Sequence, residues 1–104
     1  MSVPASGGDG GTGSAPVVMY ESHWCGYCRA ARRLLEGKGW AIDGRVVDGN
    51  APLRAEMAER AGRTSVPQIW IGGTHVGGYD DLATLEQDGE LDALYAREHD
   101  DDPV

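Results

Sequence analysis

Two cysteines, Cys25 and Cys28, lie where a strand pattern gives way to a helix pattern, and this placement constrains the fold more than any other feature. Val17–Glu21 is a short apolar run after a proline and predicts a strand. The segment from Cys25 to Lys38 predicts a helix, because its apolar residues recur every three or four positions. We therefore expect the two thiols at the N-terminus of a helix that follows a strand.

The rest of the chain continues to alternate between strand and helix patterns. The further elements expected are a strand within Trp40–Asp48, best at Arg45–Asp48; a helix capped by Asn50 and ended by Gly62; a hairpin of Gln68–Ile71 and Thr74–Val76 around Gly72–Gly73; and a helical region capped by Asp80 and divided at Gly89. The order is β-α-β-α-β-β-α(α), and its first three strands fit βαβ units. This predicts an α/β fold with a four-stranded mixed sheet flanked by helices on both faces.

The composition predicts one folded domain between two tails. Residues 1–15 are rich in glycine and serine and predict a disordered tail, while 98–104 form an acidic tail, which leaves 16–97 as the domain. No apolar stretch approaches the ~20 residues that span a bilayer, and no basic segment precedes an apolar run at the N-terminus. We therefore expect a cytoplasmic protein without a membrane partner. Separately, we expect it to be a monomer.

The formal charge of −8 is unevenly distributed along the chain. Residues 1–79 carry eight basic and seven acidic side chains, whereas 80–104 carry ten acidic side chains and one arginine. An acidic chain without a basic stripe argues against nucleic-acid binding.

The spacing of Cys25 and Cys28 suits thiol–disulfide exchange. Unpaired amides at a helix N-terminus stabilise a thiolate on the first cysteine. The second cysteine lies one turn later, where a disulfide can form with little backbone movement. Three other interpretations remain: a structural disulfide, which stabilises little when its loop is short; half of a zinc site recruiting His23 and His75, although structural zinc needs four ligands; and incidental cysteines.

Three segments in the same order resemble the glutaredoxin family, especially its small bacterial dithiol members. They are Trp24-Cys25-Gly26-Tyr27-Cys28, Ser65-Val66-Pro67-Gln68-Ile69 and Gly77-Gly78-Tyr79-Asp80-Asp81-Leu82. The resemblance covers about residues 16–97 and implies a thioredoxin-like fold, in keeping with a Cys-x-x-Cys pair near a βαβ pattern. The third segment separates glutaredoxins from ordinary thioredoxins.

The resemblance also implies roles for individual residues. Cys25 is the expected nucleophile that accepts a glutathionyl group, and Cys28 is the resolving thiol, needed for protein disulfides only. Pro67 is expected to follow a cis peptide bond, a minority form that the surrounding structure must hold. The residues expected to bind glutathione are Tyr27, Ser65, Val66, Pro67, Gly78, Tyr79, Asp80 and Asp81, with Arg63 as a further candidate for its glycine carboxylate.

The sequence departs from the family pattern at three positions. Gly26 replaces a common proline, Ser22 replaces a common basic residue, and Ser65 replaces the usual threonine. In some relatives a glycine at the place of Gly26 accompanies a bridging [2Fe-2S] cluster, which would make Cys25 a metal ligand in a glutathione-containing dimer. Cys-Gly-Tyr-Cys also occurs in mycothiol-linked redoxins.

The resemblance therefore implies a glutathione-disulfide oxidoreductase. Its expected partners are glutathione, glutathionylated proteins and disulfide substrates, with glutathione reductase and NADPH restoring the reduced pool. The alternatives are a glutathione-ligated [2Fe-2S] carrier or sensor and a mycothiol-linked redoxin.

Overall fold

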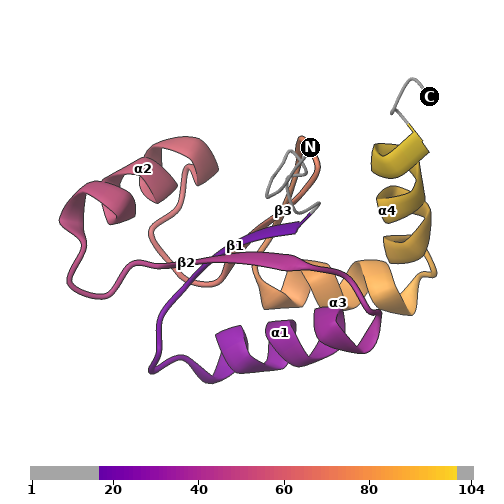
Figure 1. The fold of residues 1–104 in the computed structure, drawn as a ribbon, viewed down its shortest axis with the longest axis horizontal. Helices are drawn as coiled ribbons and strands as arrows, with labels where there is room; N and C mark the ends of the chain where they lie inside the picture. The colour runs from indigo at the N-terminus through magenta and orange to yellow at the C-terminus, as the bar shows by residue number, and fades with distance from the viewer. Residues whose placement is uncertain (1–16, 101–104) are drawn as a thin grey trace, which may run out of the picture.

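The computed structural model describes residues 17–100, in which a four-stranded sheet forms the middle layer (Figure 1). The strands are β1 (Val17–Glu21), β2 (Ile42–Val46), β3 (Gln68–Ile71) and β4 (Thr74–Gly77), and the helices are α1 (Gly26–Gly37), α2 (Ala51–Ala61), α3 (Tyr79–Gln87) and α4 (Leu91–Asp100). The tail expected over 1–15 lies outside the described residues. The predicted α/β class and four-stranded mixed sheet are confirmed.

The sheet order is β2-β1-β3-β4, and the strand directions differ from the predicted ones. Strand β2 runs parallel to β1, but β3 runs antiparallel to β1, with Val17 opposite Ile71. The prediction that the first three strands form successive βαβ units is therefore wrong for β3. All four residues of β3 are buried, and a strand buried on both faces has the same apolar pattern whichever way it runs.

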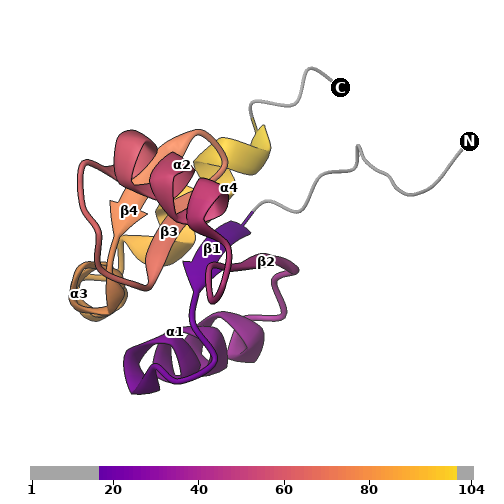
Figure 2. The same ribbon diagram turned by 90° about the vertical axis from the view of Figure 1, so that its left-hand side faces the viewer.

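Helices cover both faces of the sheet, as predicted (Figure 2). On one face α1, α3 and α4 pack against the sheet, and on the other face α2 packs against it. The first core contains Val17, Met19, Ala31, Leu35, Ile69, Ile71, Leu82, Leu91 and Leu94. The second core contains Tyr20, Val47, Met57 and Trp70. Alternate residues of β1 and β3 contribute to opposite cores, because successive side chains of a strand point to opposite faces.

The capping residues predicted for α2 are confirmed, whereas the residue predicted to cap α3 is wrong. Asn50 Oδ1 accepts from the Leu53 N–H at 3.1 Å, and Gly62 ends α2 in the left-handed region at φ 70°. Helix α3 is capped by Gly78, not by Asp80. Instead, Asp81 in its first turn accepts from the Gly78 N–H at 3.0 Å, so a carboxylate one residue later than expected satisfies the helix start.

Strand β2 lies about three residues earlier than the best predicted position of 45–48. The Val47 N–H still bonds to the Glu21 carbonyl at 2.9 Å, but Asp48 has left the sheet and bonds to the loop before α1. The apolar residues at 46–47 therefore mark the end of this strand and not its middle.

Helix α4 reaches Asp100, three residues into the segment predicted as an acidic tail. Glu98 explains this extension, because its two carboxylate oxygens accept from the Gly73 N–H at 2.9 Å and from the Thr74 hydroxyl at 3.0 Å. The hairpin turn packs so closely here that a Cβ on Gly72, at φ 59°, would lie 2.1 Å from a Glu98 oxygen.

Candidate active site

Cys25 is the N-cap of α1, so its sulfur lies at the helix start as the sequence predicts. Its Sγ accepts from the Cys28 N–H at 3.2 Å, and its thiol lies 3.6 Å from the carbonyl oxygen of Val66. The Cys25 side chain is partly exposed. A substrate disulfide can therefore reach this sulfur from solvent, directly beside the backbone of Val66.

Cys28 is placed differently, since it is only 2 % exposed and faces the core. Burial raises the pKa of the Cys28 thiol to about 12, because the protein interior solvates a thiolate poorly; a backbone hydrogen bond from Ser22 acts in the opposite direction. Both cysteines are free thiols in this structure. Cys28 therefore stays protonated and inaccessible near neutral pH, whereas the Cys25 sulfur can be reached from solvent.

We expect the buried Cys28 thiol to make the reduced protein lose stability at high pH. The pKa of this thiol is higher in the folded chain than the ~8.5 of an exposed thiol, so its contribution is intact below pH ~8.5 and is lost as pH rises toward 12. The loss should approach about 1.4 kcal/mol per pH unit, roughly 2 kcal/mol between pH 9 and 10.5.

The measurement is urea unfolding of the reduced protein under anaerobic conditions, with Cys28→Ser as the matched variant. The difference in unfolding free energy between the two proteins gives the contribution of the Cys28 thiol alone, because tyrosines and lysines titrate in both proteins and cancel. A difference that stays constant from pH 8 to 10.5 would contradict the assignment.

The loop between β1 and α1 is held by Asp48, a residue that the sequence analysis did not single out. Asp48 accepts from the Ser22 hydroxyl at 2.7 Å and from the His23 N–H at 2.8 Å, while the Ser22 hydroxyl oxygen accepts from the Trp24 N–H at 3.3 Å. These hydrogen bonds, led by that of His23, hold the pKa of the Asp48 carboxyl below its ordinary value. Ser22, which departs from the family pattern, thus fixes the loop that carries Cys25.

Asp48 could have been found from its position in the sequence. It lies two residues after β2, which runs parallel to β1, and the carboxyl ends of parallel strands meet at one edge of a sheet. A polar residue there is close to the residues that follow β1.

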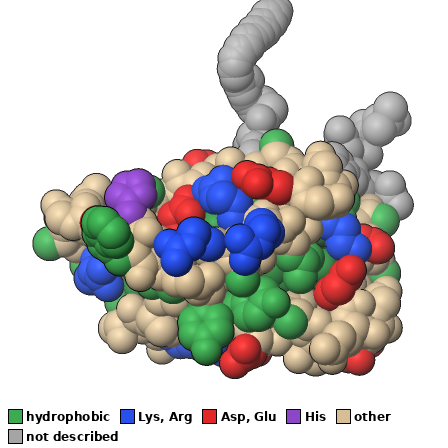
Figure 3. All heavy atoms as spheres, turned by 90° about the horizontal axis from the view of Figure 1, so that it is seen from below, with side chains coloured by type: hydrophobic (Ala, Val, Ile, Leu, Met, Phe, Trp, Pro, Cys, Tyr) green, Lys and Arg blue, Asp and Glu red, His purple; other side chains and the backbone are tan. Residues whose placement is uncertain are grey.

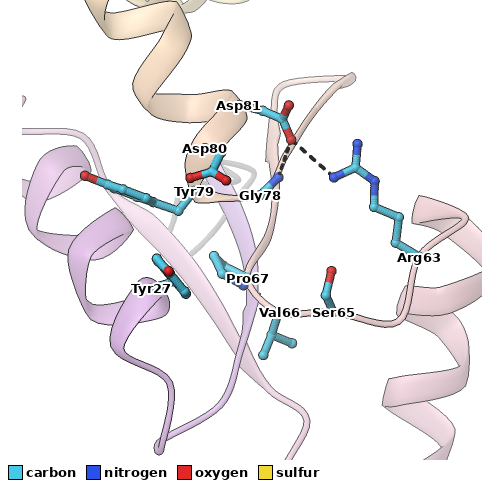
Figure 4. A pocket seen from close by; sticks show the side chains of 9 residues that line it. All are labelled: Tyr27, Arg63, Ser65, Val66, Pro67, Gly78, Tyr79, Asp80 and Asp81. Atoms are coloured by element: carbon cyan, nitrogen blue, oxygen red, sulfur yellow. Dashed lines mark hydrogen bonds and ion pairs between the residues drawn. The ribbon is translucent and has the colours of Figure 1, made fainter.

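A cleft of about 260 Å³ lies beside Val66 and gathers all eight residues predicted to bind glutathione (Figure 4). This volume is close to the roughly 300 Å³ at which small-molecule pockets begin. The lining residues are Tyr27, Arg63, Ser65, Val66, Pro67, Gly78, Tyr79, Asp80 and Asp81. They come from α1, from the loop before β3 and from the start of α3.

One wall of the cleft is charged. Asp81 accepts from the Gly78 N–H and from the Arg63 guanidinium at 3.2 Å, and these two donors, Gly78 foremost, hold the pKa of its carboxyl below its ordinary value. A Cβ on Gly77, at φ 113°, would lie 2.3 Å from this carboxylate, so only glycine lets Asp81 reach back. Asp80 is exposed beside it.

The opposite wall is aromatic and apolar. Tyr27 stacks with Tyr79, with ring centroids 6.1 Å apart, and Tyr27 remains 64 % exposed. Tyr27 is therefore exposed at the cleft and is not part of the core. The Val66–Pro67 peptide bond is cis, as the resemblance implies.

A buried hydrogen-bond network supports the loop that forms the floor of the cleft. Gln68 is fully buried, and its Nε2 donates to the Ser65 carbonyl at 3.0 Å and lies 3.3 Å from the Ser65 hydroxyl. Its Oε1 therefore accepts from His75 Nε2 at 2.9 Å. Burial lowers the pKa of His75, so a neutral ring fills this position. Neither Gln68 nor His75 was predicted as part of the site.

His23 and His75 do not join the cysteines in a metal site. Among the side chains that the structure describes, those of residues 17–98, no group of three or more His, Cys, Asp or Glu is arranged to hold a metal ion. No helix in the same stretch is long and apolar enough to cross a membrane.

Together, the fold and the cysteine pair define a thiol–disulfide oxidoreductase with a thioredoxin-like fold. The family model for glutaredoxin matches residues 17–76. A glutaredoxin of Pseudomonas aeruginosa is 57 % identical over 76 % of this chain and 94 % of its own length, and glutaredoxin 3 of Escherichia coli is 48 % identical over 77 % and 96 %. The chain belongs to the glutaredoxin family.

Solved structures agree with this assignment. The solution structure of glutaredoxin from Brucella melitensis has a TM-score of 0.69 at 46 % identity, covering 82 % of this chain and 94 % of that one. The crystal structure of a buckwheat glutaredoxin–glutathione complex has a TM-score of 0.75 at 26 % identity, covering 82 % and 80 %. The thioredoxin-like fold and the oxidoreductase class are thereby confirmed.

Proposed function

We propose that this protein reduces glutathione mixed disulfides and protein disulfides, with glutathione as its reductant. The supporting observation is the position of the Cys25 sulfur, 3.6 Å from the carbonyl oxygen of a residue that lines the cleft. A tripeptide bound along Val66 would present its own sulfur to Cys25.

The chemistry of the cleft matches the two ends of glutathione. The γ-glutamyl end carries a carboxylate, which suits the amides at the start of α3, and an ammonium, which suits Asp81. Arg63 suits the glycine carboxylate, and its long side chain would turn away from Asp81, 3.2 Å distant, to reach that other end of the tripeptide. The buckwheat relative has been solved in complex with glutathione, which favours the same ligand here.

The one-thiol route uses Cys25 alone. Its thiolate attacks the glutathione sulfur of a protein–glutathione mixed disulfide, a Cys25–glutathione disulfide forms, and the protein thiolate leaves and takes up a proton. The thiolate of a second glutathione then attacks the glutathione sulfur bound to Cys25. Oxidised glutathione leaves, and the Cys25 thiolate is restored.

The two-thiol route adds Cys28 when the substrate is a protein disulfide. Cys25 attacks one substrate sulfur and releases the other as a thiol, which leaves the substrate joined to Cys25 by a mixed disulfide. Cys28 then loses its proton and attacks the Cys25 sulfur, so the second substrate thiol is released and a Cys25–Cys28 disulfide remains. Two glutathione molecules reduce this disulfide and leave as oxidised glutathione.

Regeneration of the reductant requires a partner. NADPH and glutathione reductase would convert oxidised glutathione back to two thiols, which closes the cycle. We place this cycle in the cytoplasm and expect the protein to act as a monomer.

A [2Fe-2S] cluster fits the described residues less well. Such clusters take four thiolate ligands, and within residues 17–100 one chain offers a single accessible thiol, because Cys28 is buried. A cluster would therefore need a second chain and two glutathione thiols. The carrier function would be favoured by two results together: visible absorbance after the purified protein is reconstituted with iron, sulfide and glutathione, and no turnover of a glutathione mixed disulfide.

The deciding experiment is an NADPH-coupled assay with the mixed disulfide of glutathione and 2-mercaptoethanol as substrate. The reductant is supplied in three ways: glutathione with glutathione reductase, mycothiol with its reductase, or thioredoxin reductase alone. We expect turnover with the first system at least tenfold above the other two. Faster turnover with mycothiol would overturn the proposal in favour of a mycothiol-linked redoxin.

A further inference from the structure

One face of α1 carries a row of basic side chains that begins at the reactive sulfur. Cys25, Arg29 and Arg33 follow one another at intervals of four residues, and Arg29 bonds through its N–H to the Cys25 carbonyl at 3.2 Å. The rise of an α-helix places the two arginines about 6 and 12 Å along the axis from Cys25. Figure 3 shows the side of the molecule that carries α1, where several basic side chains gather beside hydrophobic ones.

The two arginines in this row have no acidic partner among the described side chains of residues 17–98. Their neighbour Arg32 is paired with Glu21 and with Glu36, whereas Arg29 contacts only a backbone oxygen, that of His23, at 3.4 Å. Arg33 is exposed and makes no hydrogen bond or ion pair with the described residues.

An exposed tryptophan completes this face. Trp24 directly precedes Cys25, and its side chain is 89 % exposed, more than that of Tyr27 at 64 %. Its backbone N–H donates to Ser22, which Asp48 holds in turn, so the loop is fixed although the ring is in solvent. A fixed backbone lowers the entropy that such a residue loses when it binds a partner.

This face is separate from the glutathione cleft. The cleft lies along Tyr27, which at 100° per residue points about 160° away from Arg29 around the α1 axis. Cys25 lies between the two surfaces. A mixed disulfide bound at Cys25 would therefore have room for glutathione on one side and for a protein chain on the other.

We propose that Trp24, Arg29 and Arg33, the α1 docking surface, bind the protein part of the substrate. The partner it fits is an extended segment that carries acidic residues next to its reactive cysteine. Tryptophan and arginine are the residues that most often dominate binding energy, and unpaired arginines attract and orient carboxylates. This inference rests on the proposed function, because the surface acts on substrates that Cys25 reduces.

The test uses two glutathionylated octapeptides, each with a central cysteine, one flanked by two aspartates on each side and the other by lysines. Deglutathionylation is followed by NADPH oxidation with excess glutathione reductase, and kcat/KM is compared at low salt and in 0.5 M salt. We expect the acidic peptide to react about tenfold faster at low salt. At 0.5 M salt the preference should fall to about twofold, because the ions screen exposed charges.

Two matched variants locate the effect. Arg33→Glu should slow the acidic peptide about tenfold, whereas Arg97→Glu, which makes the same charge change on α4, should slow it less than twofold. Trp24→Ala should slow both peptides about tenfold, because the ring contributes apolar contact area and not charge. None of these variants should change turnover of the small mixed disulfide of glutathione and 2-mercaptoethanol by more than twofold.

The controls separate failure of this inference from failure of the proposed function. Wild-type protein that reduces the small mixed disulfide but does not distinguish the two peptides would overturn the docking surface alone. Equal effects of Arg33→Glu and Arg97→Glu would also overturn it, since net charge would then explain the preference. Wild-type protein that fails on the small mixed disulfide would overturn the proposed function itself.

Discussion

Replacement of Cys25 by serine is expected to abolish turnover of a glutathione mixed disulfide, with a loss of at least about 1000-fold in kcat. Serine fits at the N-cap position and still offers an oxygen to the Cys28 N–H, so the helix start is preserved. It provides no thiolate, however, and the buried Cys28 cannot replace it, because burial raises the pKa of that thiol to about 12.

The matched variant is Cys28→Ser, which should keep turnover of the same mixed disulfide within about threefold, because the one-thiol route does not use Cys28. The same variant should lose reduction of a protein disulfide and accumulate a covalent complex with the substrate, visible by mass spectrometry. Near-equal losses for the two serine variants would contradict the division of roles between the cysteines. Far-UV circular dichroism would show that both variants are folded.

Much of the fold follows from local patterns in the sequence. The apolar run of β1, the stripe of α1 and the Gly72–Gly73 hairpin could each be predicted, because neighbouring residues determine them. Strand direction could not, since every residue of β3 is buried and its pattern reads the same both ways. The sheet acquires its antiparallel β1–β3 pair from tertiary packing.

The candidate site likewise contains residues that could be predicted from the sequence and residues that could not. The cysteine pair and the cleft residues stand in three short motifs, and the structure places them together around Val66. Asp48 and His75 stand outside these motifs, and Gln68, although it lies in the second motif, was predicted only as a strand residue. Their supporting contacts, Asp48 with Ser22 and Gln68 with Ser65 and His75, become visible only in the folded structure. Local pattern thus identifies the residues that line the candidate site better than the residues that hold them in place.

The C-terminal end of the folded region shows that a run of acidic residues does not always mark a solvated tail. The acidic residues from 98 onward resemble a solvated tail, yet Glu98 belongs to α4 and holds the hairpin turn through two hydrogen bonds. The backbone N–H of Gly73, foremost, and the Thr74 hydroxyl keep the pKa of its carboxyl below its ordinary value. A carboxylate near backbone amides is a structural group, and only the tertiary structure shows which acidic residue has such a neighbour.

We expect Asp81→Asn to raise the KM for glutathione mixed disulfides by roughly 10- to 150-fold, which corresponds to the loss of one charge-assisted hydrogen bond of about 1.5–3 kcal/mol. Asparagine keeps an oxygen that can accept from the Gly78 N–H, so the start of α3 is retained. The charge that would meet the γ-glutamyl ammonium is removed, and the Arg63 guanidinium, 3.2 Å from Asp81 Oδ2, becomes an unpaired positive charge in the cleft.

Asp80 provides the comparison within the same helix turn. Asp80 is exposed, and its side chain makes no hydrogen bond or ion pair with the side chains described for residues 17–98, whereas Gly78 and Arg63 hold Asp81 in one position. A carboxylate already fixed in the cleft loses less entropy on binding, so Asp80→Asn should raise KM less than fivefold. The exposed Asp88→Asn, with the same charge change at the far end of α3, should leave KM unchanged within twofold. An effect of Asp80→Asn as large as that of Asp81→Asn would show that the ammonium is bound by the free carboxylate and not by the fixed one.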